Sequence, residues 1–125
     1  MHAKISKILS GVAGEHFVAA ELTRRGYIAS LTSQNTKGID TLASNEDASK
    51  KVGIQVKTKQ TGGDGWILGK GNEDYYSDNL YYVFVNLNSL GMPTFYIAPS
   101  KGVAYYIRAA HQAWLDIPGK LLLTY

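Results

Sequence analysis

The stretch from residue 80 to residue 87 constrains the fold more than any other part of this 125-residue chain. Its sequence, LYYVFVNL, is dense in aromatic and β-branched residues and carries no charge. Residues of this kind favour β-strands, because their side chains pack well on a pleated surface. We therefore predict a central strand here, and the rest of the chain has to supply neighbours for it.

Helices are predicted near both ends of the chain. Residues 8 to 25 have helical periodicity, and Gly26 follows where a left-handed stop is expected. Towards the other end, Pro99 closes a strand and Ser100 is predicted to cap a helix that extends to about Leu115.

Further strands are predicted between these helices, at residues 27–32, 38–44, 52–58 and 94–98, with a brief edge strand at 66–68. Residues 60–79 contain many glycines and are predicted to form a long loop. The order of elements predicts an α/β fold, with a mixed sheet of about five strands and helices on both faces. At this length we expect a single domain spanning residues 1–125.

Composition excludes several classes of protein. The chain has no cysteine, so disulfides and thiolate zinc sites are excluded, which fits a reducing, cytoplasmic compartment. No apolar run has the ~18 residues that a membrane span needs, and the apolar stretch near the N-terminus is too short for a signal peptide. The net charge of +3 permits an anionic partner, but residues 60–79 hold one lysine against four acids. Any basic face therefore excludes that segment.

Glu15 is an unexpected residue in the first helix. At about 100° per residue, it falls in the middle of an apolar arc. The members of that arc are Ile8, Val12, Val18, Ala19 and Leu22. Burial disfavours the charged form of a carboxylate unless something pairs with it. We therefore expect Glu15 to be buried and to have a partner where the helix packs on the sheet.

Two polar residues interrupt the strand predicted at residues 52–58. Alternation places Gln55 and Lys57 on one face of this strand and its apolar residues on the other. In the strand predicted at 38–44, Asp40 points to the same side as Gln55 and Lys57 if the two strands are neighbours. An acid, an amide and a lysine are then brought together.

This combination suits the hydrolysis of a phosphodiester. A divalent cation held by oxygen ligands stabilises the charge of the transition state and activates a water molecule. Asp40 and Gln55 offer oxygen ligands for Mg²⁺ or Mn²⁺, and Lys57 is suited to orient the water and to neutralise developing charge. Glu15, projecting from the helix, could reach the metal directly or through water.

The chain resembles the PD-(D/E)xK nuclease superfamily, and most of all small proteins related to archaeal Holliday-junction resolvases and methyl-directed restriction endonucleases. The specific matches are residues 11–15 (GVAGE), 18–22 (VAAEL), 35–40 (NTKGID) and 54–58 (IQVKT), within a resemblance that covers about residues 8 to 110. It implies a restriction-endonuclease-like sandwich and a metal site formed by Glu15, Asp40, Gln55 and Lys57. The implied activity is Mg²⁺- or Mn²⁺-dependent hydrolysis of DNA.

Two positions depart from the pattern of that superfamily. Position 55 carries Gln where most members have Glu or Asp, a variant also found in restriction-enzyme-like branches, and Ile39 replaces the usual Pro. Two other functions therefore stay open. The chain could be a DNA-binding module that has lost turnover, or an interaction protein in which Glu15 and Lys57 form a structural ion pair.

Four lysines near the predicted site are candidates for contacts with DNA phosphates: Lys37, Lys50, Lys51 and Lys59. The tyrosines within strands are interpreted as core or sheet-face residues. Small nucleases that cut duplex DNA often need a dimer, so a homodimer is also considered. The sequence does not distinguish one DNA structure from another as the substrate.

Overall fold

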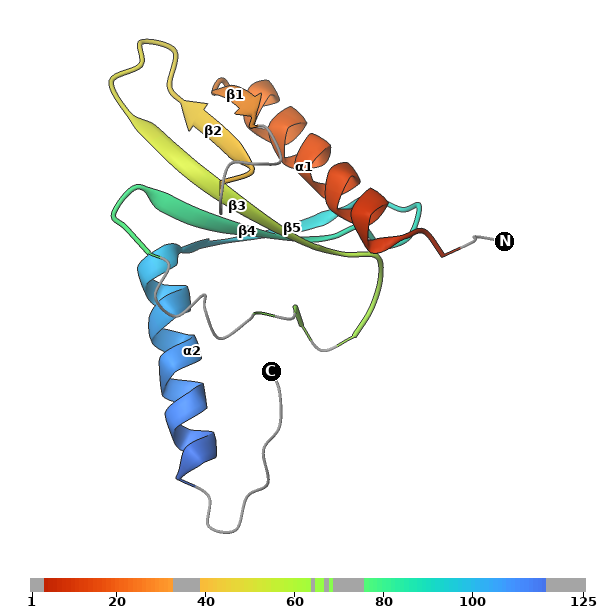
Figure 1. Ribbon diagram of the computed structural model, residues 1–125. Helices are drawn as coiled ribbons and strands as arrows, with labels where there is room; N and C mark the ends of the chain where they lie inside the picture. The colour runs from red at the N-terminus through yellow and green to blue at the C-terminus, as the bar shows by residue number, and fades with distance from the viewer. Residues whose placement is uncertain (1–3, 33–38, 64, 67, 69–75, 117–125) are drawn as a thin grey trace.

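The computed structural model describes residues 4–32, 39–63, 65, 66, 68 and 76–116. Figure 1 shows its elements in chain order: α1 (Lys7–Arg24), β1 (Ile28–Leu31), β2 (Thr41–Ser44), β3 (Lys51–Lys59), β4 (Leu80–Asn86), β5 (Thr94–Pro99) and α2 (Ser100–Leu115). The α/β class predicted from the sequence is confirmed. Neither helix is long and apolar enough to cross a membrane, as far as the described residues show.

The five strands form one mixed sheet in the order β1-β2-β3-β4-β5. β3 and β4 are parallel, with Gln55 opposite Tyr82 and Lys57 opposite Phe84, and the other three pairs are antiparallel. β4 is the strand predicted from residues 80–87, and it is paired on both sides. The mixed sheet of five strands is therefore confirmed, and its parallel pair consists of the central strand β3 and the neighbouring strand β4.

Local signals in the sequence determine where α1 begins and ends. The side chain of Ser6 accepts a hydrogen bond from the N–H of Leu9 at 3.1 Å, which satisfies a donor in the first turn. Gly26 ends the helix with a φ of 97°, and the N–H of Tyr27 then donates to the carbonyl of Leu22 at 3.0 Å. A residue with a side chain is strained at that φ, so glycine suits this stop.

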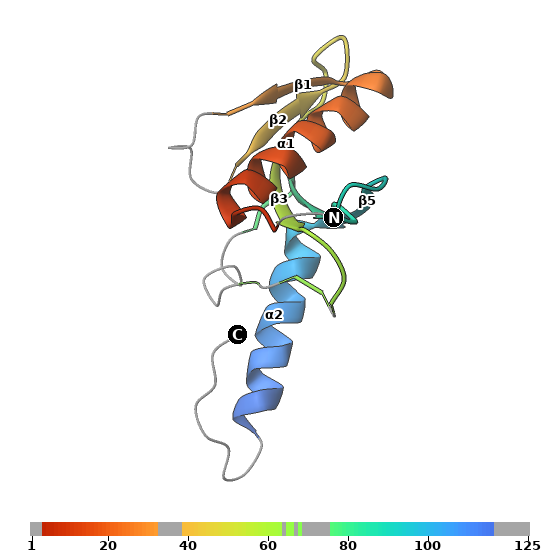
Figure 2. The ribbon, with the colours of Figure 1, turned by 90° about the vertical axis from the view of Figure 1, so that its right-hand side faces the viewer.

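The helices lie on opposite faces of the sheet (Figures 1 and 2). On the α1 face, Val18 packs with Ile54, Val83 and Val85 in the larger hydrophobic core. On the α2 face, Tyr82 packs with residues of α2 in a smaller core, and α2 then extends away from the sheet in both views. Because neighbouring residues of a strand point to opposite faces, β4 contributes to both cores.

The orientation of α1 differs from the arc predicted for it. Ile8 is 76% exposed, whereas Ser10, Gly14 and Val18 are the buried residues of the helix. Gly14 has no side chain, so Thr58 of β3 comes close to the helix backbone, and the small residues face the sheet. The prediction that Ile8 lies on the buried face was therefore wrong. Glu15, predicted to be buried, is half-buried.

Two further local predictions need correction. Trp66 and Leu68 do not belong to a strand. The side chain of Trp66 contacts β4 by donating a hydrogen bond to the carbonyl of Val85 at 3.0 Å. Ser100 is fully buried at the start of α2. Its hydroxyl donates to the carbonyl of Ser77 at 2.9 Å and accepts from the N–H of Ser77 at 3.0 Å. That hydroxyl holds the loop before β4 in place of the predicted capping role.

Candidate functional site

Asp40 is held by three hydrogen bonds at the start of β2. Its N–H donates to the carbonyl of Ile54 at 2.8 Å, and its carbonyl accepts from the N–H of Thr32 at 3.0 Å. Its carboxylate oxygen Oδ2 accepts from the N–H of Val56 at 2.7 Å. Backbone groups of β3 and of the residue after β1 thus fix Asp40, and one carboxylate oxygen is bound directly against β3.

Gln55 and Lys57 lie on the face of β3 that points away from α1. Ile54 and Val56 pack with the α1-side core, so by alternation their neighbours point to the other face. The N–H of Asp40 bonds the carbonyl of Ile54, where a continued register of β2 and β3 would pair Asp40 with Gln55, so the ladder is irregular here and Asp40 lies beside residues 54–56 of β3. The side-chain oxygen of Gln55 is buried and accepts no hydrogen bond from any described residue. A buried acceptor without a donor is costly, and a cation or water beside it would remove that cost.

Glu15 approaches the site from the helix side. It follows Gly14, the residue that packs on Thr58, and it is half-buried. Its carboxylate lies close enough to Asp40 for the two negative charges to interact. Within the described part of the chain, no ion pair joins Glu15 to Lys57. The charge of Lys57 acts on the carboxylate of Asp40.

The two carboxylates have unusual proton affinities. Burial raises the pKa of Asp40 above its ordinary value, although the hydrogen bond from Val56 and the charge of Lys57 act in the opposite direction. Burial also raises the pKa of Glu15, the charge of Asp40 raises it further, and His16 opposes this. Burial disfavours the charged forms of both carboxylates. A cation bound nearby would stabilise these charged forms.

The donor set fits a hard divalent cation. Glu15, Asp40 and Gln55 offer oxygen atoms, which Mg²⁺ and Mn²⁺ prefer, and the oxygen of Gln55 has no other described donor. Only two of these three residues are acids. Among the described residues, no three His, Cys, Asp or Glu side chains form a metal-binding group, so a cation held by the two acids would take its other ligands from the amide oxygen or from water.

The predicted phosphate contacts divide between the two sides of the sheet. Lys51 and Lys59 are an even number of residues away from Gln55 and Lys57 along β3, so they lie on the same face of the strand. Lys50 instead lines a cavity on the α1 face. Lys37 lies outside the described residues. Two of the four lysines therefore share the strand face of Gln55 and Lys57.

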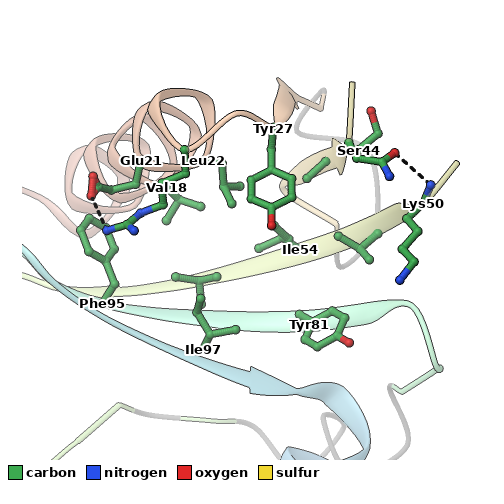
Figure 3. A pocket seen from close by; sticks show the side chains of 15 residues that line it. Val18, Glu21, Leu22, Tyr27, Ser44, Lys50, Ile54, Tyr81, Phe95 and Ile97 are labelled. Atoms are coloured by element: carbon green, nitrogen blue, oxygen red, sulfur yellow. Dashed lines mark hydrogen bonds and ion pairs between the residues drawn. The ribbon is translucent and has the colours of Figure 1, made fainter. Parts of the chain in front are cut away.

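A cavity under α1 is separate from this site. It has a volume of about 860 Å³ and none of the four predicted site residues lines it. Figure 3 shows Val18 and Leu22 of α1 on one side and Phe95 and Ile97 of β5 on the other. The cavity is a mostly apolar space between α1 and the sheet, and Glu21, Arg25 and Lys50 are the charged residues in its lining.

Two features near the site were not found from the sequence. One is the close packing of Gly14 on Thr58, for which the glycine just before Glu15 was the available signal. The other is a contact between the ammonium of Lys59 and the ring of Trp66, with 4.2 Å from Nζ to the ring centroid. Sequence periodicity could not reveal this contact, because Trp66 lies in a segment without regular structure.

No protein-family model matches this chain, and no curated protein or solved structure matches it either. Its function therefore has to be inferred from its own side chains.

Proposed function

We propose that this protein is a Mg²⁺- or Mn²⁺-dependent deoxyribonuclease of the PD-(D/E)xK type. The observation that carries the proposal is the convergence at one end of β2. The carboxylate of Asp40 is bound to β3 at Val56, the residue between Gln55, whose buried side-chain oxygen has no described donor, and Lys57, whose charge interacts with Asp40. Glu15 adds a second carboxylate within electrostatic range of Asp40.

Each of these residues has a definite role in the proposed reaction. Asp40 and Gln55 would hold the cation, and Glu15 would complete its surroundings directly or through water. A cation bound there supplies positive charge that acidifies a water and offsets charge on the phosphate. Lys57 positions the attacking water and stabilises the negative charge that develops on the phosphate oxygens.

Cleavage assays on DNA test this proposal. The protein should cleave linear duplex, branched or single-stranded DNA in Mg²⁺ or Mn²⁺ and should leave it intact in EDTA. Lys57→Ala should slow cleavage by about a hundredfold or more, because it removes a charge that stabilises the transition state. Lys7→Ala, an exposed lysine at the start of α1, is the control and should cleave normally. A wild type that cleaves none of these DNAs, or a Lys57→Ala variant as fast as Lys7→Ala, would refute the proposal.

One observation favours a second candidate, a DNA-binding module without turnover. Gln55 supplies a neutral oxygen where a carboxylate would bind a cation more tightly, so the described site has two acids. Gln55→Glu should raise the affinity for Mn²⁺ by about tenfold in calorimetry if the site is a metal site. A gain of cleavage in this variant over an inactive wild type would identify the module. The same substitution at Gln60, just after β3, is the control.

DNA in the cytoplasm is the proposed partner. The basic residues Lys51 and Lys59 on the face of the candidate site support contact with phosphates, and the cysteine-free composition fits a reducing compartment. A homodimer would allow both strands of a duplex to be cut, and sedimentation of the protein with and without duplex DNA would test for it.

A further inference from the structure

A cluster of aromatic rings covers the sheet beside the candidate site. Trp66 lies 5.4 Å from Phe84 and 5.7 Å from Tyr96 between ring centroids, and Phe84 stacks on Tyr82 at 5.7 Å with 7° between the rings. The ammonium of Lys59 lies 4.2 Å from the centroid of the Trp66 ring. These contacts, with the hydrogen bond from Trp66 to β4, fix the rings in place.

Tyr96 is the exposed member of this cluster. Its side chain is 56% exposed, although it lies on β5 in register with Phe84 of the α2-side core. The edge-type contact with Trp66, at 66° between the ring planes, holds the tyrosine in one orientation. An aromatic ring that is held from one side and open on the other can stack with a planar ligand at little entropic cost.

The strand register links Tyr96 to the candidate site. Lys57 pairs with Phe84, and Phe84 pairs with Tyr96, so the three residues form a row across β3, β4 and β5 on one face. Two strand spacings place Tyr96 about 10 Å from Lys57. That span equals about three rises of ~3.4 Å along a DNA strand, so one strand could reach both residues. Lys59 adds a positive charge beside this row.

We propose that Tyr96, supported by Trp66, stacks on an unpaired DNA base a few nucleotides from the bond that is cleaved. This inference rests on the proposed nuclease function and names its substrate class, single-stranded DNA. A duplex presents only base edges in its grooves, and its base faces are stacked on one another. An aromatic face on the protein therefore contacts a base only where that base is unpaired, and such stacking is tolerant of sequence.

Binding without divalent metal tests the inference independently of cleavage. The background is Trp114→Phe, which leaves Trp66 as the single tryptophan. In EDTA, a short oligothymidylate should quench the emission of Trp66, and Tyr96→Ala should weaken its binding by about tenfold, whereas Tyr96→Phe should bind like the background protein. Tyr105→Ala, which changes a 74% exposed tyrosine on α2, is the matched control and should also bind normally. Affinity for a blunt duplex of the same length should not change with Tyr96→Ala.

Three outcomes would overturn the stacking site: no binding of the single strand, equal losses in Tyr96→Ala and Tyr105→Ala, or an equal loss of duplex binding. Circular dichroism of each variant separates these outcomes from misfolding, and the conservative Tyr96→Phe protein provides a folded reference. If the single strand binds through Tyr96 but no DNA is cleaved in Mg²⁺ or Mn²⁺, the nuclease proposal fails while the stacking site stands. If DNA is cleaved in Mg²⁺ or Mn²⁺ but Tyr96→Ala changes neither cleavage nor the binding of the single strand, the stacking site fails while the nuclease proposal stands.

Discussion

The two faces of the sheet are made by the same strands and differ in what they carry. The α1 face holds the larger core and an apolar cavity of about 860 Å³. The opposite face carries Gln55 and Lys57 of β3, and the aromatic row that ends at Tyr96. Strand alternation therefore places these predicted site residues on the face of the smaller core, opposite the face of the larger core, which we call the packing face. Glu15 is the exception, because it belongs to the helix on the packing face and still interacts with Asp40.

The largest expected effect on the packing face comes from the contact between α1 and β3. A Cβ at Gly14 would lie 1.9 Å from the hydroxyl oxygen of Thr58, so Gly14→Ala should lower the free energy of unfolding by about 1–3 kcal/mol. Gly11 has no atom within 4 Å of such a Cβ, and Gly11→Ala should instead stabilise the protein by about 0.5–1 kcal/mol. Urea denaturation measures both.

The Gly14 comparison has an internal check. Adding Thr58→Ala to Gly14→Ala removes two of the three clashing atoms of Thr58, Oγ1 and Cγ2, and should recover part of the lost stability, because the two sites are in contact. Equal stabilities for Gly14→Ala and Gly11→Ala would contradict the close packing of α1 on β3.

A smaller effect is expected on the salt dependence of DNA binding when two neighbouring lysines, Lys50 and Lys51, are substituted in turn. Lys51 shares the face of Gln55 and Lys57, whereas Lys50 lines the cavity on the α1 face. Lys51→Ala should reduce the slope of DNA affinity against salt concentration by about one, and Lys50→Ala should leave it nearly unchanged. Binding titrations over a range of salt concentrations measure the slopes. Equal slopes would mean that DNA does not distinguish the two faces.

The smallest effect is on the pH dependence of stability. The folded protein raises the pKa of Asp40 and Glu15 above their ordinary values of 3.8 and 4.5, so it binds more protons than the unfolded chain as these groups titrate. The metal-free protein should therefore lose stability as the pH rises above these ordinary values and through the raised pKa values of the folded state. Asp40→Asn and Glu15→Gln should each flatten this loss in thermal melts recorded in EDTA.

The control for the pH profile is Asp47, a carboxylate whose pKa is lowered in the folded protein. Hydrogen bonds from the backbone and side chain of Ser49 lower the pKa of Asp47, so its contribution to stability is lost as the pH falls. Asp47→Asn should alter the acidic end of the profile and leave the loss on rising pH intact. Site variants with the slope of the wild type would contradict the raised pKa values.

Much of the fold could be predicted from the sequence because its signals are local. The β-formers at residues 80–87 and the glycine after α1 identify the interior strand β4 and the end of the helix. The alternation of Gln55 and Lys57 with apolar residues identifies the two faces of β3. In each case, residues close together in the sequence determine the element or the strand face.

The remaining features depend on contacts between residues far apart in the chain. The rotation of α1 is set by the packing of Gly14 on Thr58, which a helical arc of apolar residues cannot reveal. Likewise, the carboxylate of Asp40 is held by the N–H of Val56, and Trp66 is held by the carbonyl of Val85. These partners are 16 and 19 residues away. Only the folded chain brings them together.

The most direct test of the proposed metal site is a crystal structure of the protein soaked in Mn²⁺, with anomalous diffraction data to locate the ion. We expect one strong peak between the carboxylate of Asp40 and the side-chain oxygen of Gln55, with distances of about 2.0–2.3 Å to both oxygens. The peak should be absent from Asp40→Asn crystals treated in the same way. A manganese ion bound elsewhere, or no ion at this position in the wild type, would contradict the central claim.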